Sequence, residues 1–228
     1  MDVGVLRRQF ATTGRLQITD ALQAAVAERL FRCLDRDVAW TLAYIDGDRS
    51  VTLPHERLKA LRPEEAAAIQ SAVHSRARDN FQFMYNSYMM VEAYVQKRDP
   101  HLPLHRFLEF LNTPPFLDFI RQISGDGSIV KADAQATRYI PGHFLKRHDD
   151  SPKEEGRRLA YVLSLTKEWQ ADWGGLLQFL DESGAVIDTF MPRYNALNLF
   201  RVPTQHCVSY VAPHARQPRY SITGWLRT

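Results

Sequence analysis

The pattern of hydrophobic and polar residues changes near residue 128 of the chain. Before that point, apolar residues recur every three or four positions over several stretches, which is the period of an amphipathic helix. After it, short apolar runs alternate with polar residues at a period near two, and Gly, Pro, Asp and Asn separate the runs. The sequence therefore predicts helices in the first part and a sheet in the second.

Four helices are predicted in the first part, two of them long and two short and opened by proline. Thr19 is a suitable N-cap for the first of them, and Pro63 suits the first turn of the second. The aromatic and methionine-rich stretch 81–90 is interpreted as buried core between these helices and the sheet. The predicted helices cover residues 19–34, 63–78, 103–111 and 114–123.

Seven strands are predicted in about a hundred residues of the second part, a spacing typical of an antiparallel sandwich or jelly roll. We therefore expect an α+β, mainly β fold, in which N-terminal helices pack on a jelly-roll barrel. The expected parts are a helical or mixed region over 1–127 and a barrel over 128–228, integrated into one domain. The predicted strands cover residues 129–140, 157–166, 175–181, 186–190, 196–202, 206–211 and 219–227.

Composition narrows the classes of function only slightly. The 228 residues have 45% hydrophobic content and a formal net charge of +3, which argues against a nucleic-acid partner. The first residues contain no signal-peptide-like apolar run, and no window has the length and apolarity of a membrane span. Cys33 and Cys207 lie far apart and form no CxxC pair. We expect no membrane association, and a cytoplasmic location by default.

The segment RYIPGHFLKRHDDSP contains a candidate pair of metal ligands. On an extended strand, residues two apart point to the same side, so His148 and Asp150 can face one point in space, whereas His143 and Asp149 are expected to face elsewhere. His206 begins a later predicted strand that can return beside the first. Two histidines and one carboxylate are the facial triad of non-haem iron oxygenases. Taken alone this pattern is weak, because a chain with 8 histidines can contain it by chance.

The last predicted strand adds an anion-binding residue. Arg219, Ser221, Thr223 and Trp225 share one of its faces by parity. If that face lines the barrel, a buried guanidinium needs an anion, and a carboxylate fits its fork through two parallel hydrogen bonds. A dicarboxylate keto acid could then chelate iron at one end and meet Arg219 at the other, a requirement that 2-oxoglutarate fulfils.

With these residues in place, the chain resembles the Fe(II)- and 2-oxoglutarate-dependent oxygenases, specifically the prolyl hydroxylase (prolyl 4-hydroxylase-like) family. The resemblance covers about residues 130–228, and the N-terminal part matches none of its motifs. It is carried by several stretches in the family's order: YIPG, RHDDSP, GRRLAYVLSLTKEW, GGLLQF, PRYNALNLF, QHCV and RYSITGW.

The resemblance implies a role for eight residues. His148, Asp150 and His206 would bind the iron, and Arg219 would bind the far carboxylate of 2-oxoglutarate. Tyr139 matches a tyrosine that hydrogen-bonds the cosubstrate, and three further positions match residues that line the pocket or the substrate mouth. The resemblance thus implies Tyr139 and Thr223 as cosubstrate contacts, and Arg157 and Trp225 as substrate contacts.

Two departures from the family pattern stand out. The family often has a second tyrosine on the strand RRLAYVLSL, and the best register places Ser164 at that position, with Tyr161 on the opposite face. The spacing from His206 to Arg219 is also longer than usual, which leaves Arg216 open as an alternative anion-binding residue. The RYSITGW context favours Arg219.

The resemblance implies a dioxygenase that hydroxylates a prolyl residue in a protein or peptide, with Fe(II), 2-oxoglutarate and dioxygen, and with ascorbate as a supporting reductant. Three alternatives stay open. The substrate could be a free amino acid or another small molecule, and the barrel could be a metal-binding module without turnover. A zinc hydrolase could use the same three ligands but would leave Arg219 unexplained. The oligomeric state does not follow from the sequence.

Overall fold

The computed structural model describes residues 2–151 and 156–228. These residues form seven α-helices, one short 3-10 helix and thirteen strands. The helices are α1 (Val3–Thr13), α2 (Ala24–Arg36), α3 (His55–Lys59), α4 (Pro63–Arg76), α5 (Met90–Val95), α6 (Pro103–Leu111), α7 (Pro114–Ser124) and η1 (Ala171–Trp173). The strands are β1 (Arg15–Ile18), β2 (Thr41–Asp46), β3 (Arg49–Leu53), β4 (Phe83–Met89), β5 (Lys131–Ala132), β6 (Gln135–Tyr139), β7 (Phe144–His148), β8 (Arg157–Ser164), β9 (Leu177–Leu180), β10 (Val186–Phe190), β11 (Ala196–Arg201), β12 (His206–Val208) and β13 (Arg219–Arg227).

The strands form one antiparallel sheet that curls into a nearly closed barrel. Its order is β1-β11-β8-β13-β6-β4-β7-β12-β9-β10, with the hairpin β2–β3 attached to β4 and β5 attached to β13. Side chains join the two end strands. Arg15 of β1 pairs with Asp188 of β10 at 2.7 Å, and Gln17 donates to the carbonyl of Met191 at 2.9 Å. The predicted α+β, mainly β jelly roll is confirmed.

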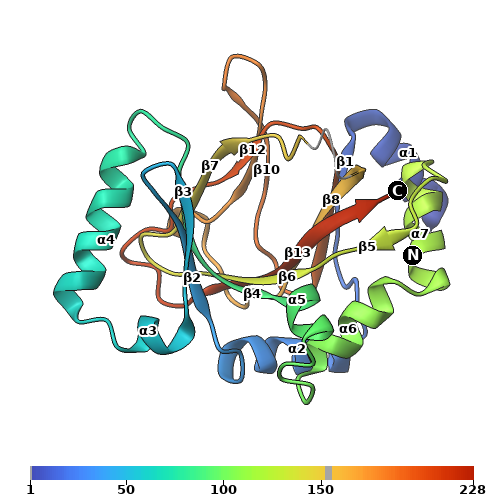
Figure 1. Ribbon diagram of the computed structural model, residues 1–228. Helices are drawn as coiled ribbons and strands as arrows, with labels where there is room; N and C mark the ends of the chain where they lie inside the picture. Colours follow the sequence, from blue (N-terminus) through green and yellow to red (C-terminus); the bar gives the residue numbers. More distant parts are fainter. Residues whose placement is uncertain (1, 152–155) are drawn as a thin grey trace.

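The helices cover the outside of the barrel. Figure 1 shows α3 and α4 on one side of the sheet, α1 and α7 on the other, and α2 and α6 beneath it. The largest core cluster lies between these helices and the outer face of β8, β11 and β13, and includes the fully buried Phe10, Leu34, Ile120 and Tyr161. Burying this apolar stripe, at about 25 cal/mol per Å², is what holds the helices on the sheet.

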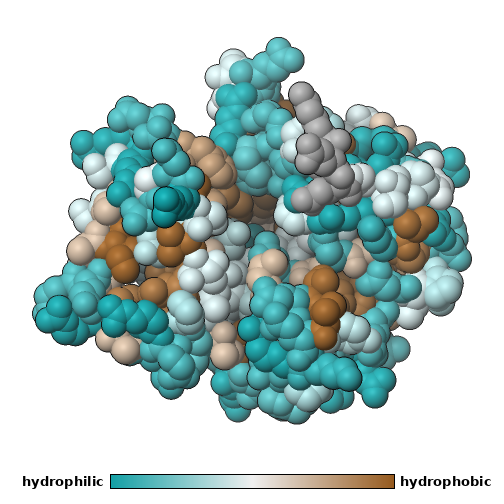
Figure 2. All heavy atoms as spheres, in the orientation of Figure 1, coloured by the Kyte–Doolittle hydropathy of each residue, from teal (hydrophilic) through white to brown (hydrophobic). Residues whose placement is uncertain are grey.

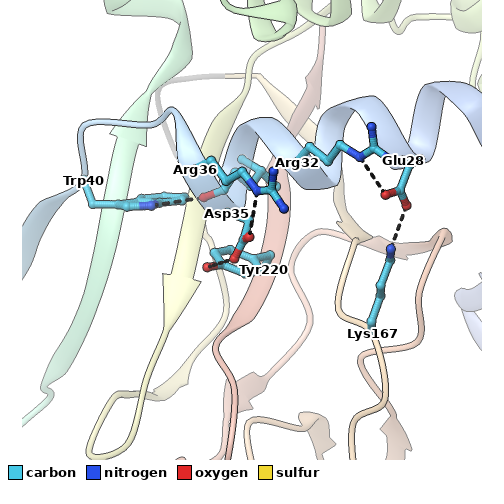
Figure 3. A network of polar contacts seen from close by, with 8 residues as sticks. Glu28, Arg32, Asp35, Arg36, Trp40, Lys167 and Tyr220 are labelled. Carbon is cyan, nitrogen blue, oxygen red and sulfur yellow. Dashed lines mark hydrogen bonds and ion pairs between the residues drawn. The ribbon is translucent and has the colours of Figure 1, made fainter.

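Polar contacts fix α2 to the strands that carry the site (Figure 3). Glu28 pairs with Lys167 at 2.7 Å, and Asp35 accepts a hydrogen bond from the Tyr220 hydroxyl at 3.1 Å. The hydrogen bond from Lys167, the largest favourable effect, lowers the pKa of Glu28 to about 2. The ring of Trp40 stacks on Tyr220 with centroids 6.2 Å apart. Tyr220 is the neighbour of Arg219, so α2 is tied to the strand that holds the candidate anion-binding residue.

The first part of the chain is less helical than its periodicity predicts. The helix expected over 19–34 begins at Ala24, because residues 15–18 form β1 and Gln23, not Thr19, occupies the N-cap. The interpretation of residues 81–90 as buried core holds for Met84, Tyr88 and Met90, which are at most 5% exposed, but most of the stretch forms β4, which lies in the sheet between β6 and β7. By contrast, the structure contains the other three predicted helices (63–78, 103–111 and 114–123) as α4, α6 and α7.

Strands from both parts of the chain pair in the sheet. β1 pairs with β11, and β4 pairs with β6 and β7. The boundary between a helical region over 1–127 and a barrel over 128–228 stays a prediction. Because strands from both regions pair in one sheet, we propose that they form one integrated domain. No helix among the residues that the structure describes has the length and apolarity needed to cross a bilayer.

Gly224 allows two segments of the barrel to approach closely. An ideal Cβ on Gly224 would overlap the backbone carbonyl oxygen of Asp133, which also accepts a 2.7 Å hydrogen bond from the Tyr161 hydroxyl. We expect Gly224→Ala to lower the free energy of unfolding by about 3 kcal/mol, since a backbone atom cannot move away as a side chain can. Urea denaturation measures the change.

Gly127 provides the matched control. A Cβ there meets nothing within 4 Å and the backbone φ is not positive, so Gly127→Ala should change stability by less than about 0.5 kcal/mol. Equal stability of the two variants would show that the Asp133 contact does not constrain the barrel.

Candidate metal centre and its cavity

Three candidate ligands meet at one end of the barrel interior. His148 is the last residue of β7, and His206 is the first residue of β12. The two strands pair antiparallel with His148 directly opposite His206. Asp150 follows β7 by two residues. One ligand atom from each residue lies within 4.8 Å of the others, and this is the one such cluster of three or more found in the described part of the chain.

The backbone conformation that places the Asp150 carboxylate at the site differs from the extended strand that the sequence pattern predicts. Strand β7 ends at His148, so Asp150 does not continue an extended strand. Its backbone has φ 56°, a left-handed conformation that bends the chain back toward the histidines. Aspartate tolerates this conformation better than most residues, because its short side chain bonds locally. The expectation that strand parity alone aligns the two residues is therefore wrong, although the convergence itself is present.

The two imidazole rings are oriented for metal binding. The Nδ1 atom of His148 lies 2.9 Å from the carbonyl of Lys146, and that of His206 lies 2.7 Å from the carbonyl of Thr204. A carbonyl only accepts, so both Nδ1 atoms carry a proton and both Nε2 atoms point to Asp150, where they can bind a metal once unprotonated. The Nε2 atoms are 3.4 and 3.5 Å from the two carboxylate oxygens of Asp150. Such second hydrogen bonds are typical of metal-binding histidines.

The protonation states also suit a divalent cation. Burial is the largest effect on His206 and lowers its pKa to about 4, so the ring is neutral at pH 7. Burial alone would raise the pKa of Asp150, but hydrogen bonding to His148 and the positive charge that either imidazole can carry outweigh it and lower the pKa. An ionised carboxylate and neutral imidazoles are the forms that bind metal. These three residues can hold Fe(II), with coordination positions left for other ligands.

Arg219 lies deeper in the same cavity, which has a volume of about 250 Å³. Its side chain is 3% exposed, and its guanidinium carbon lies 5.0 Å from the ring centre of Tyr139. Burial lowers the pKa of Arg219 from its usual value. The Nε atom has no hydrogen-bond partner among residues 2–151 and 156–228. Arg216, the alternative from sequence, is exposed.

The cavity therefore fits a dicarboxylate. A buried guanidinium without an anion is costly, and the orphaned Nε–H needs an acceptor from a bound molecule. Tyr139 is buried and stacks on Tyr85, and burial raises its pKa, which keeps the hydroxyl protonated as a donor. The Thr223 hydroxyl donates to the carbonyl of Tyr161 at 2.9 Å, so it lines the cavity with its proton already engaged.

The predicted substrate contacts lie at the mouth of the cavity. The Arg157 guanidinium packs on the indole of Trp225 with its carbon 3.6 Å from the ring centre. Both residues line the cavity together with Asp150. The structure thus brings all eight sequence-predicted site residues to one cavity. It does not test which of them contact a substrate.

Sequence reasoning missed the aromatic wall contributed by β4 and the residues before it. Phe81, Phe83 and Tyr85 line the cavity, and successive rings pack on one another with centroids 6.1 and 5.4 Å apart. Their positions differ by two, which is the signal that could have indicated a strand face. This wall makes the site partly a product of the first part of the chain.

His143 lies just before β7 and outside the ligand cluster, as expected, but its side chain is buried. Burial is the main cause that lowers its pKa to about 3, and the charges of Arg138 and His74 act in the same direction. In the unfolded chain, a histidine takes up a proton near pH 6.5. Between these pH values the unfolded state binds the extra proton, so stability falls as pH falls.

We expect His143→Leu to reduce this acid sensitivity. Between pH 6.5 and about 3 the wild type should lose up to about 1.4 kcal/mol per pH unit more than the variant. Urea titrations of the metal-free protein at several pH values measure the difference. His214 is exposed and belongs to no core cluster, so its replacement by leucine should leave the pH dependence of the free energy of unfolding as in the wild type. Identical profiles for His143→Leu and wild type would contradict the buried neutral imidazole.

Comparison with known families gives one match that spans the site. Residues 134–227 match the model of the 2OG-Fe(II) oxygenase superfamily. This range includes His148, Asp150, His206 and Arg219, and excludes the aromatic wall of β4.

Two curated proteins are similar over a longer stretch. The prolyl 3-hydroxylase OGFOD1 of Mus musculus is 28% identical over 160 residues, and that of Xenopus laevis is 27% identical over 158 residues. The matches cover 67% and 66% of this chain, and 27% and 29% of those proteins. The chain therefore spans less than a third of the length of these relatives.

Solved structures share the whole fold. A Pseudomonas putida prolyl-4-hydroxylase superposes with a TM-score of 0.60 at 19% identity, covering 99% of both chains. A Trichoplax adhaerens prolyl hydroxylase, solved with a hypoxia-inducible-factor peptide fragment, gives 0.65 at 16% identity and covers 99% of this chain and 88% of that one. At such identities the likeness shows the fold alone.

Proposed function

We propose that the protein is a dioxygenase that hydroxylates a prolyl residue in a protein or peptide, because residues 134–227 match the model of the 2OG-Fe(II) oxygenase superfamily. The observation that carries the oxygenase assignment is the placement of two sites in one cavity. The His148–Asp150–His206 cluster lies toward the mouth, and the buried Arg219 lies deeper. A module that only holds a metal has no need for the second site, and neither does a zinc hydrolase.

Each part of the cavity has a task in this function. When bound, Fe(II) and 2-oxoglutarate supply the oxidising chemistry, in which dioxygen hydroxylates the substrate as the cosubstrate becomes succinate and CO2. His148, Asp150 and His206 hold the ion, and Arg219 receives the distal carboxylate by charge-assisted hydrogen bonds. Leu177, Val208 and Phe200 give the cavity apolar walls that exclude water.

A groove beside the cavity supports a peptide rather than a free amino acid as substrate. It has a volume of about 690 Å³ and runs between the β2–β3 hairpin and the residues around β5. It shares Phe83, Tyr85, Gln135 and Trp225 with the metal cavity, so the two spaces lie side by side. Figure 2 shows this face of the molecule hollowed near its middle. A single amino acid would leave most of the groove unfilled.

Prolyl specificity rests on weaker support than the oxygenase chemistry. The relatives named prolyl hydroxylases are at most 28% identical to this chain. The match to the two curated proteins covers less than a third of the length of each. The cytoplasmic location and the absence of a nucleic-acid partner stay predictions from the sequence.

The direct test is to supply Fe(II), 2-oxoglutarate and air together with a digest of cellular proteins, and to search for peptides that gain one oxygen atom. We expect the gain on proline-containing peptides, and none when 2-oxoglutarate is omitted. Hydroxylation of free proline with no change in any peptide would contradict the peptide assignment while leaving the oxygenase assignment intact.

A further inference from the structure

An apolar space lies outside the barrel, between its outer face and the helices. This inner space has a volume of about 310 Å³ and is lined by residues of α6, α7, β1, β8 and β11 and of the loop after β1. Among them are Leu111, Tyr161 and Leu163, which are at most 2% exposed. Ala160 and Val162, which alternate with Tyr161 and Leu163 on β8, line the metal cavity instead. The strand therefore separates the inner space from the metal cavity.

The inner space has no free hydrogen-bonding side chain among the described residues that line it. All of them are aliphatic or aromatic, and the one hydroxyl, that of Tyr161, already donates to the carbonyl of Asp133 at 2.7 Å. Protein interiors contain few voids larger than a water molecule, and an unfilled space of this size costs stability. Water is a poor filler here, since an ordered water needs two to four polar partners. The inner space therefore suits the alkyl part of a ligand.

A wider outer space adjoins the inner one and carries positive charge. It has a volume of about 660 Å³ and lies between α2 and α6, which Figure 1 shows beneath the barrel. It shares four residues with the inner space, including Ala21 and Phe110. Arg29 of α2 and Arg106 of α6 line it and are exposed, whereas no described acidic residue lines either space. The charged groups thus lie on the solvent side of an apolar chamber.

Both arginines are available to an anion. Among the residues that the structure describes, none forms an ion pair with Arg29. Glu28, its neighbour in sequence, is engaged by Lys167 at 2.7 Å. Arg106 lies 3.5 Å from Glu109, but the two side chains are 88% and 43% exposed, and such a surface pair contributes little to stability. A carboxylate is the anion that a guanidinium fork matches best among simple organic groups.

An alkyl chain fits the inner space better than a helix of a partner protein does. A helix with its side chains is about 10 Å wide and rises about 5.4 Å per turn, so one turn takes up about 400 Å³. The inner space is smaller than that. Small-molecule sites typically have volumes of about 300–1,000 Å³, with mostly apolar walls and a few polar groups that fix the orientation. The inner and outer spaces match this description.

We propose that the protein binds a medium-chain fatty acid between α2, α6 and α7. The alkyl chain occupies the inner space, and the carboxylate lies in the outer space at Arg29 and Arg106. This site is separate from the metal cavity, so it holds whether or not the proposed function is correct.

The test measures dissociation constants by calorimetry on the whole chain without metal, with hexanoate, octanoate, decanoate and 1-decanol below their micelle-forming concentrations. Each methylene that enters the inner space should strengthen binding by about fourfold, because apolar burial is worth about 0.8 kcal/mol per methylene. The alcohol has the same chain as decanoate but no charge. It should bind more weakly than decanoate and be insensitive to the arginines.

Two sets of variants locate the two ends of the ligand. Replacing both Arg29 and Arg106 by glutamine should weaken decanoate by about tenfold and 1-decanol by less than about twofold. Arg36→Gln is the control, since Arg36 is an exposed arginine of α2 that lines neither space. Ala21→Phe fills the junction of the two spaces and should weaken both ligands by more than about tenfold. Ala67→Phe, on the exposed face of α4, should weaken neither.

The outcomes are decisive without reference to oxygenase activity. A wild type that binds no decanoate, or binds all three carboxylates with the same affinity, overturns the inference. Retained decanoate affinity in the double arginine variant would contradict the position of the carboxylate. Retained affinity in an Ala21→Phe protein that melts as the wild type does would contradict the position of the chain. If that variant does not fold, the chain-length series and the arginine variants still decide.

Discussion

Replacement of Asp150 by alanine is expected to remove specific metal binding. Asp150 supplies the one carboxylate of the ligand cluster, and its two oxygens face the Nε2 atoms of both histidines at 3.4 and 3.5 Å. Without it, two neutral imidazoles must hold a divalent cation with no compensating charge. Loss of residues that only support a metal ligand costs about 10–100-fold in affinity, so loss of the ligand itself should exceed about 100-fold. Titration with Mn(II) or Fe(II) followed by calorimetry measures the change.

The neighbouring aspartate is a close control for this experiment. Asp149 accepts a 2.8 Å hydrogen bond from the Ser151 amide and one from Gln205 at 3.4 Å, and it is not part of the cluster. Asp149→Ala has the same change in charge and should bind metal within a few-fold of the wild type. If the two variants lost equal affinity, the effect would come from net charge near the site and not from coordination.

Replacement of Arg219 by alanine should have the second largest effect, on the affinity for 2-oxoglutarate. The guanidinium is buried and lies beside Tyr139 and Ser221, and no other residue in the described part of the chain pairs with its Nε. Two charge-assisted hydrogen bonds to a carboxylate contribute about 3–6 kcal/mol, so the dissociation constant should rise by about 100-fold or more. Calorimetry on the Mn(II)-loaded variant measures it, and metal affinity itself should be retained.

Two further variants sharpen the assignment of the anion site. Arg216→Ala removes the exposed arginine that sequence spacing left open, and it should leave the affinity for 2-oxoglutarate unchanged. Arg219→Lys keeps the charge but loses the fork and should recover only part of the affinity. Loss of binding in Arg216→Ala with retention in Arg219→Ala would reverse the assignment.

Much of the barrel and the site could be predicted from the sequence because both depend on strand periodicity. Period-two runs predicted β8 to β13, and parity on β13 predicted that Arg219 and Trp225 share a cavity. The pairing of β12 with β7, which brings His206 opposite His148, follows from the same antiparallel order. The period-two runs and the parity of side chains are local patterns that a single strand displays in full.

The remaining features depend on contacts between distant segments, which one strand cannot display. Strand β1 has four residues and is held by pairing with β11 and by the Arg15–Asp188 ion pair, so its own sequence carries little signal. The position of Asp150 depends on a positive φ after the strand ends, a turn feature that periodicity does not report. The burial of His143 is a tertiary property for the same reason.

The central claim is that one cavity holds Fe(II) and 2-oxoglutarate together. The most direct test is the visible absorption of the anaerobic protein with Fe(II), before and after 2-oxoglutarate is added. If the claim is correct, a weak charge-transfer band appears in the wild type, is absent in Asp150→Ala, and requires far more 2-oxoglutarate in Arg219→Ala. A wild type that binds both additives and shows no band would contradict it.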